Sequence, residues 1–270
     1  MKNKKLSHNG LQGSVTSVMA ALLCILIGLA VGFLVLLAIN PAHAWADGFV
    51  RILKGGFHDA PYGVGKELAN AAPLIMTGLS VGFAFKTGLF NIGAAGQYTL
   101  GAYGALYCAI MLKLPWFVCL LAAAILGGLW GAIPGFFKAY FNINEVITSI
   151  MFNWIGLYLV NELVYQNGTG PMYDVRNTRT LNLGKNADLA QSVIPDFGLN
   201  KLFQTNSTTI AIFLAAVVAI LIWVVLNKTT FGYELKAVGL NKSAARYAGI
   251  NEKKNIILSM AIAGALAGFG

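Results

Sequence analysis

The stretch that decides the fold is VMAALLCILIGLAVGFLVLLAI, residues 18–39, which contains no charged side chain. A helix needs about 20 apolar residues to cross the roughly 30 Å hydrocarbon core of a bilayer, so this stretch predicts a transmembrane helix. Lys2, Lys4 and Lys5 precede it, as they would in a signal peptide. The apolar run is longer than the roughly 7–15 residues of a signal-peptide core, and we therefore expect an uncleaved first helix.

Six more stretches have the same character. They cover residues 68–85, 87–112, 114–137, 146–161, 202–227 and 255–270, and none shows the polar–apolar alternation of a membrane β-strand. The pattern predicts an all-α polytopic integral membrane protein with six full transmembrane helices plus a truncated seventh, which is cut short at Gly270. Lys86 and Lys113 separate successive stretches, so we expect very short turns there.

The composition supports a membrane protein. Of the 270 residues 57% are apolar and only 11% are charged, against about 25% charged in a soluble domain. Cys24, Cys108 and Cys119 lie inside apolar runs and predict neither a disulfide framework nor a metal site. In a soluble protein the net charge of +9 would suggest nucleic acid, but here we expect no nucleic acid and interpret the charge as a signal of orientation.

The distribution of basic residues favours a cytoplasmic N-terminus. With that orientation 11 of the 19 Lys and Arg residues, but only three acidic residues, lie inside. We expect a cytoplasmic arm over residues 1–17 and a single transmembrane domain over 18–270. External segments would cover about 40–67 and 162–201 and could carry short surface helices, and a basic cytoplasmic loop would cover about 228–254.

No motif for catalysis is present. All three histidines lie outside the apolar stretches, and the sequence has no His-Glu-x-x-His, nucleophile elbow or phosphate-binding loop. We therefore expect a non-catalytic protein that binds no cofactor or metal itself. Any dependence on ATP must come from another subunit.

A first polar cluster interrupts the apolar run in GLFNIGAAGQ, residues 88–97. Its candidate residues are Asn91, Gly93, Gly96 and Gln97. Amide side chains at membrane depth need hydrogen-bond partners, and glycine permits closely packed or broken backbone. The pattern is typical of a helix start beside a solute path, or alternatively of hydrogen bonds that hold helices together.

A second polar cluster lies in NEVITSIMFN, residues 144–153. At helical spacing Glu145, Thr148, Ser149 and Asn153 share one side, opposite Val146, Ile150 and Trp154. Such a polar side is unsuited to lipid and could line a path. Glu145 could instead favour the start of the helix electrostatically, with Asn142 or Asn144 as its cap.

A third cluster is a basic segment with ordered glycines and alanines. Its candidate residues are Gly232, Glu234, Lys236, Gly239, Asn241, Ala244, Ala245, Arg246 and Gly249. We expect Asn241 to cap a helix that starts at Lys242 and Gly249 to end it. The segment is interpreted as a docking element, the alternative being a plain basic loop.

Glycine also recurs at the spacing that lets helices approach closely. The pairs are Gly78 with Gly82, Gly101 with Ala105, Gly131 with Gly135, and Gly264 with Gly268. Each pair predicts a close helix contact or, alternatively, a moving or solute-lining one.

Four ordered motifs, PLIMTGLS (73–80), GLFNIGAAGQ, NEVITSIMFN and FGYELKAVGLN (231–241), carry a resemblance to a known family. The chain resembles permease subunits of bacterial ATP-binding-cassette (ABC) importers for branched-chain amino acids, simple sugars and nucleosides, most closely the guanosine-type nucleoside permeases. Many relatives have an acidic residue at Ala95, so no ionic role is transferred to that position. Relatives also continue for several more helices, and we expect C-terminal helices to be missing here.

The resemblance implies the partners and the location. They are cytoplasmic ABC ATPase subunits that use ATP and Mg, a second permease subunit in a heterodimer, an extracellular or periplasmic solute-binding protein, and the lipid bilayer of the bacterial cytoplasmic membrane. The first two clusters would belong to the solute path and residues 232–250 to the ATPase-coupling loop. The alternatives are an ion- or proton-coupled secondary transporter or channel, a membrane scaffold, or an ABC permease for simple sugars or riboflavin-like solutes.

Overall fold

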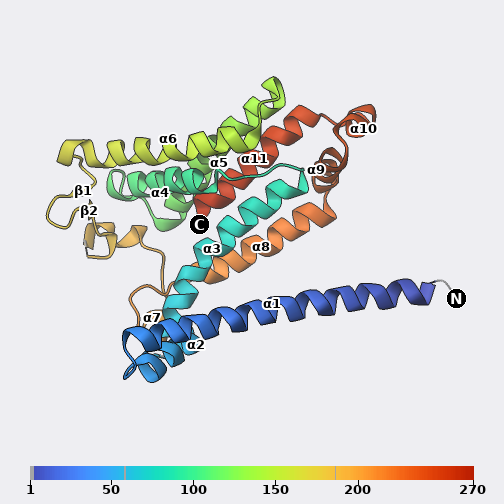
Figure 1. Ribbon diagram of the computed structural model, residues 1–270. Helices are drawn as coiled ribbons and strands as arrows, with labels where there is room; N and C mark the ends of the chain where they lie inside the picture. The colour runs from blue at the N-terminus through green and yellow to red at the C-terminus, as the bar shows by residue number, and fades with distance from the viewer. Residues whose placement is uncertain (1–2, 58, 186) are drawn as a thin grey trace. The chain divides into compact units, whose positions relative to one another are not determined.

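The computed structural model describes residues 3–57, 59–185 and 187–270, and helices dominate it (Figure 1). Five helices in the described residues are long and apolar enough to cross a membrane. They are α1 (Asn3–Ile39), α3 (Tyr62–Lys86), α5 (Trp116–Phe141), α6 (Glu145–Tyr165) and α8 (Ala211–Lys228). The predicted class, an all-α polytopic membrane protein, is thereby confirmed.

The other two predicted spans also form helices, although they are less suited to crossing. Helix α4 (Ala94–Ile110) has 17 residues. Helix α11 (Glu252–Phe269) has 18 residues and begins with three charged side chains, Glu252, Lys253 and Lys254. The count of six full spans and a truncated seventh stays a prediction.

The chain divides into two compact units, Met1–Val64 and Gly65–Gly270. In the first, α1 is followed by η1 (Ala44–Phe49), α2 (Val50–Lys54) and η2 (Gly55–Phe57). Residues 40–67 thus carry the short helices that were expected there, and the external position of this segment stays a prediction. Phe33 of α1 packs on Trp45 and Phe49, with ring centroids 5.6 and 4.9 Å away. Of the predicted arm, residues 1–17, residues 3–17 form the first part of α1, and residues 1 and 2 lie outside the described residues.

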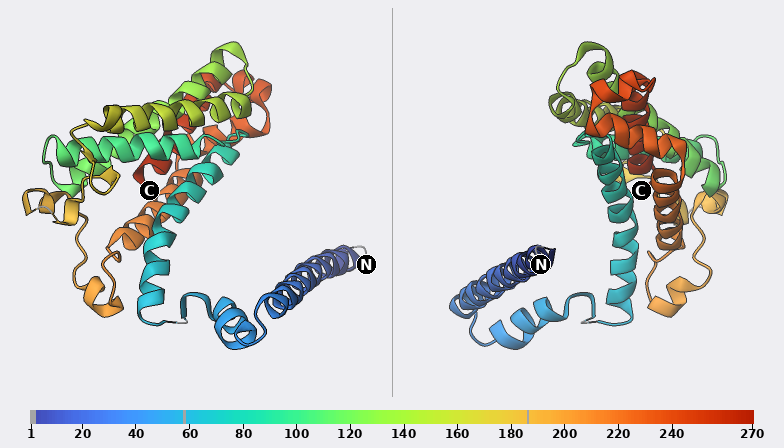
Figure 2. Two further views of the ribbon diagram at one scale, coloured as in Figure 1. Left: turned by 60° about the vertical axis from the view of Figure 1, so that its left-hand side comes forward. Right: turned by 90° about the vertical axis from the view of Figure 1, so that its right-hand side faces the viewer.

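The second unit has a tightly packed group of helices. Helices α4, α5, α6 and α11 lie side by side (Figures 1 and 2). Glycines and their neighbours make this possible: a Cβ on Gly127 would lie 2.5 Å from the Gly264 carbonyl oxygen, and one on Gly101 would lie 2.4 Å from Gly268. Gly131 and Gly135 likewise face α11. The predicted close contacts at these glycines are confirmed, because backbones this near exclude any side chain.

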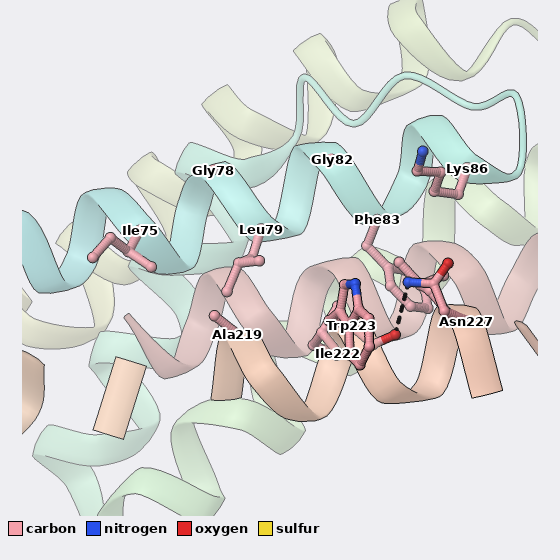
Figure 3. A pocket seen from close by; sticks show the side chains of 11 residues that line it. Ile75, Gly78, Leu79, Gly82, Phe83, Lys86, Ala219, Ile222, Trp223 and Asn227 are labelled. Atoms are coloured by element: carbon pink, nitrogen blue, oxygen red, sulfur yellow. Dashed lines mark hydrogen bonds between the residues drawn. The ribbon is translucent and has the colours of Figure 1, made fainter. Parts of the chain in front are cut away.

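Helices α3 and α8 are separated by a cavity of about 620 Å³. Figure 3 shows Gly78 and Gly82 of α3 on one side, with Trp223 and Asn227 of α8 on the other. A Cβ on either glycine would meet no atom within 4 Å. The close helix contact predicted for this glycine pair is therefore wrong in the described part of the chain, where the pair opens a space instead.

Two helices begin later than the charge pattern predicts. Helix α4 begins at Ala94 rather than Thr87, because α3 ends in a turn at Gly88 (φ +68°) in which Leu89 N–H donates to the Ala84 carbonyl. The connection is therefore residues 87–93 and not the very short turn expected. Helix α8 begins at Ala211 rather than near residue 202, because Thr205 and Thr208 bond each other and the local backbone.

Small elements fill the connections at both ends of this unit. Between α6 and α8 lie η3 (Gln166–Gly168), the strands β1 (Tyr173–Asp174) and β2 (Arg179–Thr180), η4 (Leu183–Lys185), η5 (Ala187–Ser192) and α7 (Leu199–Phe203). The strands form an antiparallel hairpin, and Ser192 Oγ donates to the Leu114 carbonyl of the α4–α5 connection, 2.6 Å away. We call the end of the unit that carries these elements, residues 166–203, the hairpin end. Helices α9 (Thr230–Leu240) and α10 (Lys242–Tyr247) lie at the other end (Figure 1).

The turn of the hairpin is held by one carboxylate. Asp174 accepts from the Asn177 side chain at 2.8 Å and from the Arg176 N–H at 3.1 Å. The Asn177 hydrogen bond, above all, lowers the pKa of Asp174 from its ordinary value. The lowered pKa means that Asp174 supports the hairpin above the ordinary Asp pKa, and that this support disappears as the pH falls.

Candidate solute path and coupling surface

Asn91 and Gln97 form a reciprocal pair at the start of α4. Asn91 Nδ2 donates to Gln97 Oε1 at 2.8 Å, and Gln97 Nε2 donates to Asn91 Oδ1 at 3.0 Å. Asn91 also donates to Ser80 Oγ of α3 at 2.9 Å, and both amides are 1% exposed. Gly93 lies against both, since a Cβ there would be 3.0 Å from Gln97 Nε2. These hydrogen bonds join α3 to the start of α4, which agrees with the alternative that the amides hold helices together.

Asn153 of α6 joins this cluster from the side. Its Oδ1 accepts from Gly96 N–H at 2.7 Å, and its Nδ2 donates to the Ile92 carbonyl at 2.8 Å. Gly96 lies in the first turn of α4, where an N–H has no partner within the helix. Asn153 therefore caps α4 from a neighbouring helix. We call Asn91, Gln97 and Asn153 the amide cluster.

The remaining residues of the second motif lie along α6. Thr148 and Ser149 are buried, whereas Ile150 and Trp154 are exposed, which confirms the predicted two-sided helix. Thr148 Oγ1 donates to the Asn144 and Glu145 carbonyls of its own helix. Ser149 Oγ is buried without a partner among the described residues, and a Cβ on Gly93 would lie 3.4 Å from Ser149 Cβ.

Glu145 lies apart from the amide cluster. Its carboxylate pairs with Lys138 Nζ of α5 at 2.8 Å, and both side chains are more than four-fifths buried. Asn144 caps α6, because its Oδ1 accepts from Val146 N–H at 2.8 Å. The sequence indicated the helix start but not the Lys138 partner, since the two residues are joined by a turn whose geometry the pattern does not define.

A cavity of about 240 Å³ opens between α4 and α6. Its lining residues are Ala95, Gly96, Thr99, Asn153, Trp154 and Leu157. Of the residues predicted for the solute path, Gly96 and Asn153 border this cavity. Asn91, Gln97 and Ser149 lie behind them in packed protein, and no motif singled out Thr99.

The predicted docking element is built as two capped helices. Thr229 caps α9 by accepting from Gly232 N–H, and Asn241 caps α10 by accepting from Ala244 N–H, each at 3.1 Å. Gly249 (φ +80°) ends α10 in a Schellman motif in which Ile250 N–H donates to the Ala245 carbonyl. The predicted roles of Asn241 and Gly249 are confirmed.

Polar side chains tie these helices to their neighbours. Glu234 of α9 accepts from Asn255 of α11 at 3.0 Å, and Lys236 donates to Asn227 of α8 at 2.9 Å. Arg246 forms a weaker pair with Glu252 at 3.9 Å. Ala245 is buried in the core, but Ala244 is exposed. A Cβ on Gly232 would lie 2.3 Å from the Val225 carbonyl, so the close turn from α8 into α9 requires glycine there.

The backbone of α9 touches the turn that leads to the amide cluster. A Cβ on Gly239 would lie 2.5 Å from the Lys86 carbonyl oxygen, and one on Gly88 would lie 3.1 Å from the Gly239 carbonyl oxygen. Thr87 Oγ1 and Ser259 Oγ are 2.5 Å apart, which fixes the same turn to α11. Leu89 packs in one apolar core with residues of α9, α10 and α11. The docking element and the amide cluster are therefore in continuous contact.

The most exposed residues of this element are not among the candidate residues that the sequence motifs indicated. Leu240 is 89% exposed, Tyr247 is 92% exposed and Tyr233 is 71% exposed. Apolar side chains in a loop resemble core residues in sequence, and only the structure shows that these three face outward. We call Leu240 and Tyr247, with the basic Lys242 and Arg246 beside them, the coupling surface.

Long apolar helices, buried amides at a helix start and a capped basic element define a multi-pass membrane protein of the permease class. The chain belongs to the family described as the permease component of the branched-chain amino acid transport system, whose model matches residues 65–270.

Three relatives show where the chain lies within that family. The guanosine ABC transporter permease protein NupP of Bacillus subtilis is 35% identical over 98% of this chain and 71% of its own length. The nucleoside ABC transporter permease protein NupB of Lactococcus lactis is 32% identical over 94% of this chain and 69% of its own. The glucose ABC transporter permease protein TsgB13 of Haloferax volcanii is 35% identical over 92% and 65%. No solved structure matches the chain significantly.

Proposed function

We propose that the protein is the permease subunit of an ATP-driven ABC importer that moves nucleosides across the bacterial cytoplasmic membrane. Family membership and the two nucleoside-permease relatives carry this proposal. The protein itself is non-catalytic and binds no cofactor, and separate ATPase subunits use ATP and Mg. An importer of simple sugars is the second candidate, and the glucose-permease relative favours it.

The orientation follows the basic residues, with the N-terminus and the coupling surface in the cytoplasm. The hairpin end then faces outward, where an extracellular or periplasmic solute-binding protein would deliver the solute. A second permease subunit completes the path as a heterodimer partner. The exposed apolar faces of the helices, such as Ile147 and Met151 on α6, suit either that partner or lipid.

The contacts of α9 suggest how ATP would drive the solute path. ATPase movement would reach the coupling surface and pass through Gly239 to the turn at Lys86–Gly88. That turn continues directly into Asn91 and the start of α4, which borders the cavity beside α6. Displacement of the turn would thus change the path without any charged group crossing the membrane.

Uptake of labelled solutes tests the transported class. Cells that lack their own nucleoside uptake would express this permease with the other subunits of its transporter, and guanosine and glucose would be offered separately. We expect saturable, ATP-dependent guanosine uptake that unlabelled glucose does not inhibit. Uptake of glucose alone would establish the second candidate instead.

The coupling surface predicts a specific loss of ATPase binding. Replacing Leu240 and Tyr247 together by Ser removes exposed apolar anchors without touching the core, so the ATPases should no longer co-purify and uptake should stop. The matched control replaces Val175 and Phe197, which are 66% and 80% exposed at the hairpin end. Normal ATPase co-purification with the double variant of the coupling surface would contradict the docking role.

A further inference from the structure

Trp154 lies in an unusual position for a membrane tryptophan. It is 57% exposed and nine residues after the start of α6, which is about 13.5 Å along a helix of roughly 31 Å. Tryptophan at the surface of a span normally lies at the membrane interface. Trp223 follows that rule, since it lies near the end of α8 with Lys228 Nζ 5.9 Å from its ring. Trp154 is placed near the middle of its span instead.

The indole N–H of Trp154 also has no acceptor among the described residues. By contrast, Trp130 donates its indole N–H to the Phe152 carbonyl at 3.1 Å. An unpaired donor in an apolar environment loses the hydrogen bond it had in water, which opposes exposure to lipid tails at this depth. Any acceptor for this N–H comes from outside the described residues.

The surroundings of Trp154 suit a flat polar ring. Trp154 borders the cavity of about 240 Å³ between α4 and α6, together with Thr99 and Asn153. Thr99 Oγ1 donates to the Ala95 carbonyl at 2.8 Å, which leaves its oxygen free to accept. Both ends of the Asn153 amide are bonded, one to Gly96 of α4 and one to the Ile92 carbonyl just before that helix, so this wall of the cavity is fixed. Tyr158 stacks on Trp154 at 6.1 Å and extends the aromatic surface.

The size of the cavity indicates what part of a solute it holds. Sites that enclose a whole small molecule have volumes of about 300–1,000 Å³, so this cavity is a partial site. A nucleobase is flat, carries polar atoms along its edge and stacks on aromatic side chains. A lipid tail has no acceptor for the indole N–H, and the proposed function favours a nucleobase over a hexose.

We propose that the α4–α6 cavity is the nucleobase half-site of the solute path and that Trp154 is its stacking residue. This inference rests on the proposed nucleoside function and names the part of the solute that the cavity recognises. The second permease would cover the open side, and the sugar would extend toward it.

Direct binding tests the inference. The assembled transporter, with the solute-binding protein omitted, is equilibrated with tritiated guanosine, or is photolabelled with 8-azidoguanosine and digested to map the labelled peptide. The variants are Trp154→Leu, Trp154→Phe, and Trp223→Leu as the control of equal exposure. Trp154→Leu should weaken guanosine binding by roughly 5- to 150-fold, Trp154→Phe should retain most of it, and Trp223→Leu should leave it unchanged.

The outcomes separate this inference from the proposed function. Label on α4 or α6 that excess guanosine displaces and glucose does not, together with the loss in Trp154→Leu, supports the half-site. If the wild type transports guanosine but Trp154→Leu binds it normally, the half-site is overturned and the proposed function stands. If Trp154→Leu no longer pairs with the second permease but binds guanosine normally, the half-site is also overturned, because Trp154 then belongs to the subunit interface. If the wild type transports only glucose, both the half-site and the proposed nucleoside function are overturned.

Discussion

Asn153 shows how one side chain connects helices α6 and α4. Its amide satisfies an N–H in the first turn of α4 and a carbonyl just before that helix. Both of these hydrogen bonds are part-buried, and removal of the amide would break both of them.

Replacing Asn153 by Ala should therefore lower the free energy of unfolding by about 1–3 kcal/mol, because the Gly96 N–H is left without a partner. Thermal unfolding of the purified protein in nanodiscs measures this. The control, Asn161→Ala, alters an exposed residue of the same helix and should change stability by less than about 0.5 kcal/mol. Equal stability of the two variants would show that Asn153 does not hold α4 in place.

Some residue roles could be predicted from sequence and others could not. Asn241 and Gly249 act through neighbours a few residues away, so their spacing alone indicates a helix start and a helix end. The pairing of Lys138 with Glu145 depends on the geometry of a turn. The outward direction of Leu240 and Tyr247 depends on how α9 and α10 pack, which local spacing does not encode.

At the level of elements, α9 is held against the turn after α3 by backbone contact. Residues 78 and 82 on α3 illustrate the opposite case, since their glycines face an open cavity (Figure 3). The same small-residue spacing thus produced a tight contact between α5 and α11 and an opening between α3 and α8. The spacing permits close approach but does not determine which helix approaches. The sequence therefore predicted the close contact between α5 and α11 correctly and the contact at Gly78 and Gly82 incorrectly.

Replacing Gly239 by Ala should uncouple ATP hydrolysis from transport, because the new Cβ would overlap the Lys86 carbonyl and push α9 from the turn. Overpacking such a contact costs about 1–3 kcal/mol, so we expect α9 to shift and uptake per ATP hydrolysed to fall. Reconstituted vesicles allow both rates to be measured. Gly78→Ala, which meets no atom within 4 Å, should retain the wild-type ratio. A normal ratio in Gly239→Ala would exclude this contact as the route of coupling.

At the scale of the whole molecule, the helix pattern assigns the two ends of the second unit to opposite sides of the membrane. Tyr247 and Val175 are exposed at these two ends. The basic residues of the short loops indicate which end is inside.

Single cysteines test that orientation. With Cys24, Cys108 and Cys119 replaced by Ala, a cysteine at position 175 should react with a membrane-impermeant maleimide added to intact cells. A cysteine at position 247 should react only after the membrane is opened, because the coupling surface is assigned to the cytoplasm. Labelling of both positions, or of 247 alone, in intact cells would refute this topology.

The reciprocal pair of Asn91 and Gln97 has an electrical consequence. Asn and Gln amides carry no net charge and do not titrate in the physiological range, so the pair is the same at any pH the cell encounters. A membrane potential does work only on charge that moves across it, at about 2.3 kcal/mol per elementary charge per 100 mV. Because the pair carries no net charge, the voltage across the bilayer neither stabilises nor destabilises it.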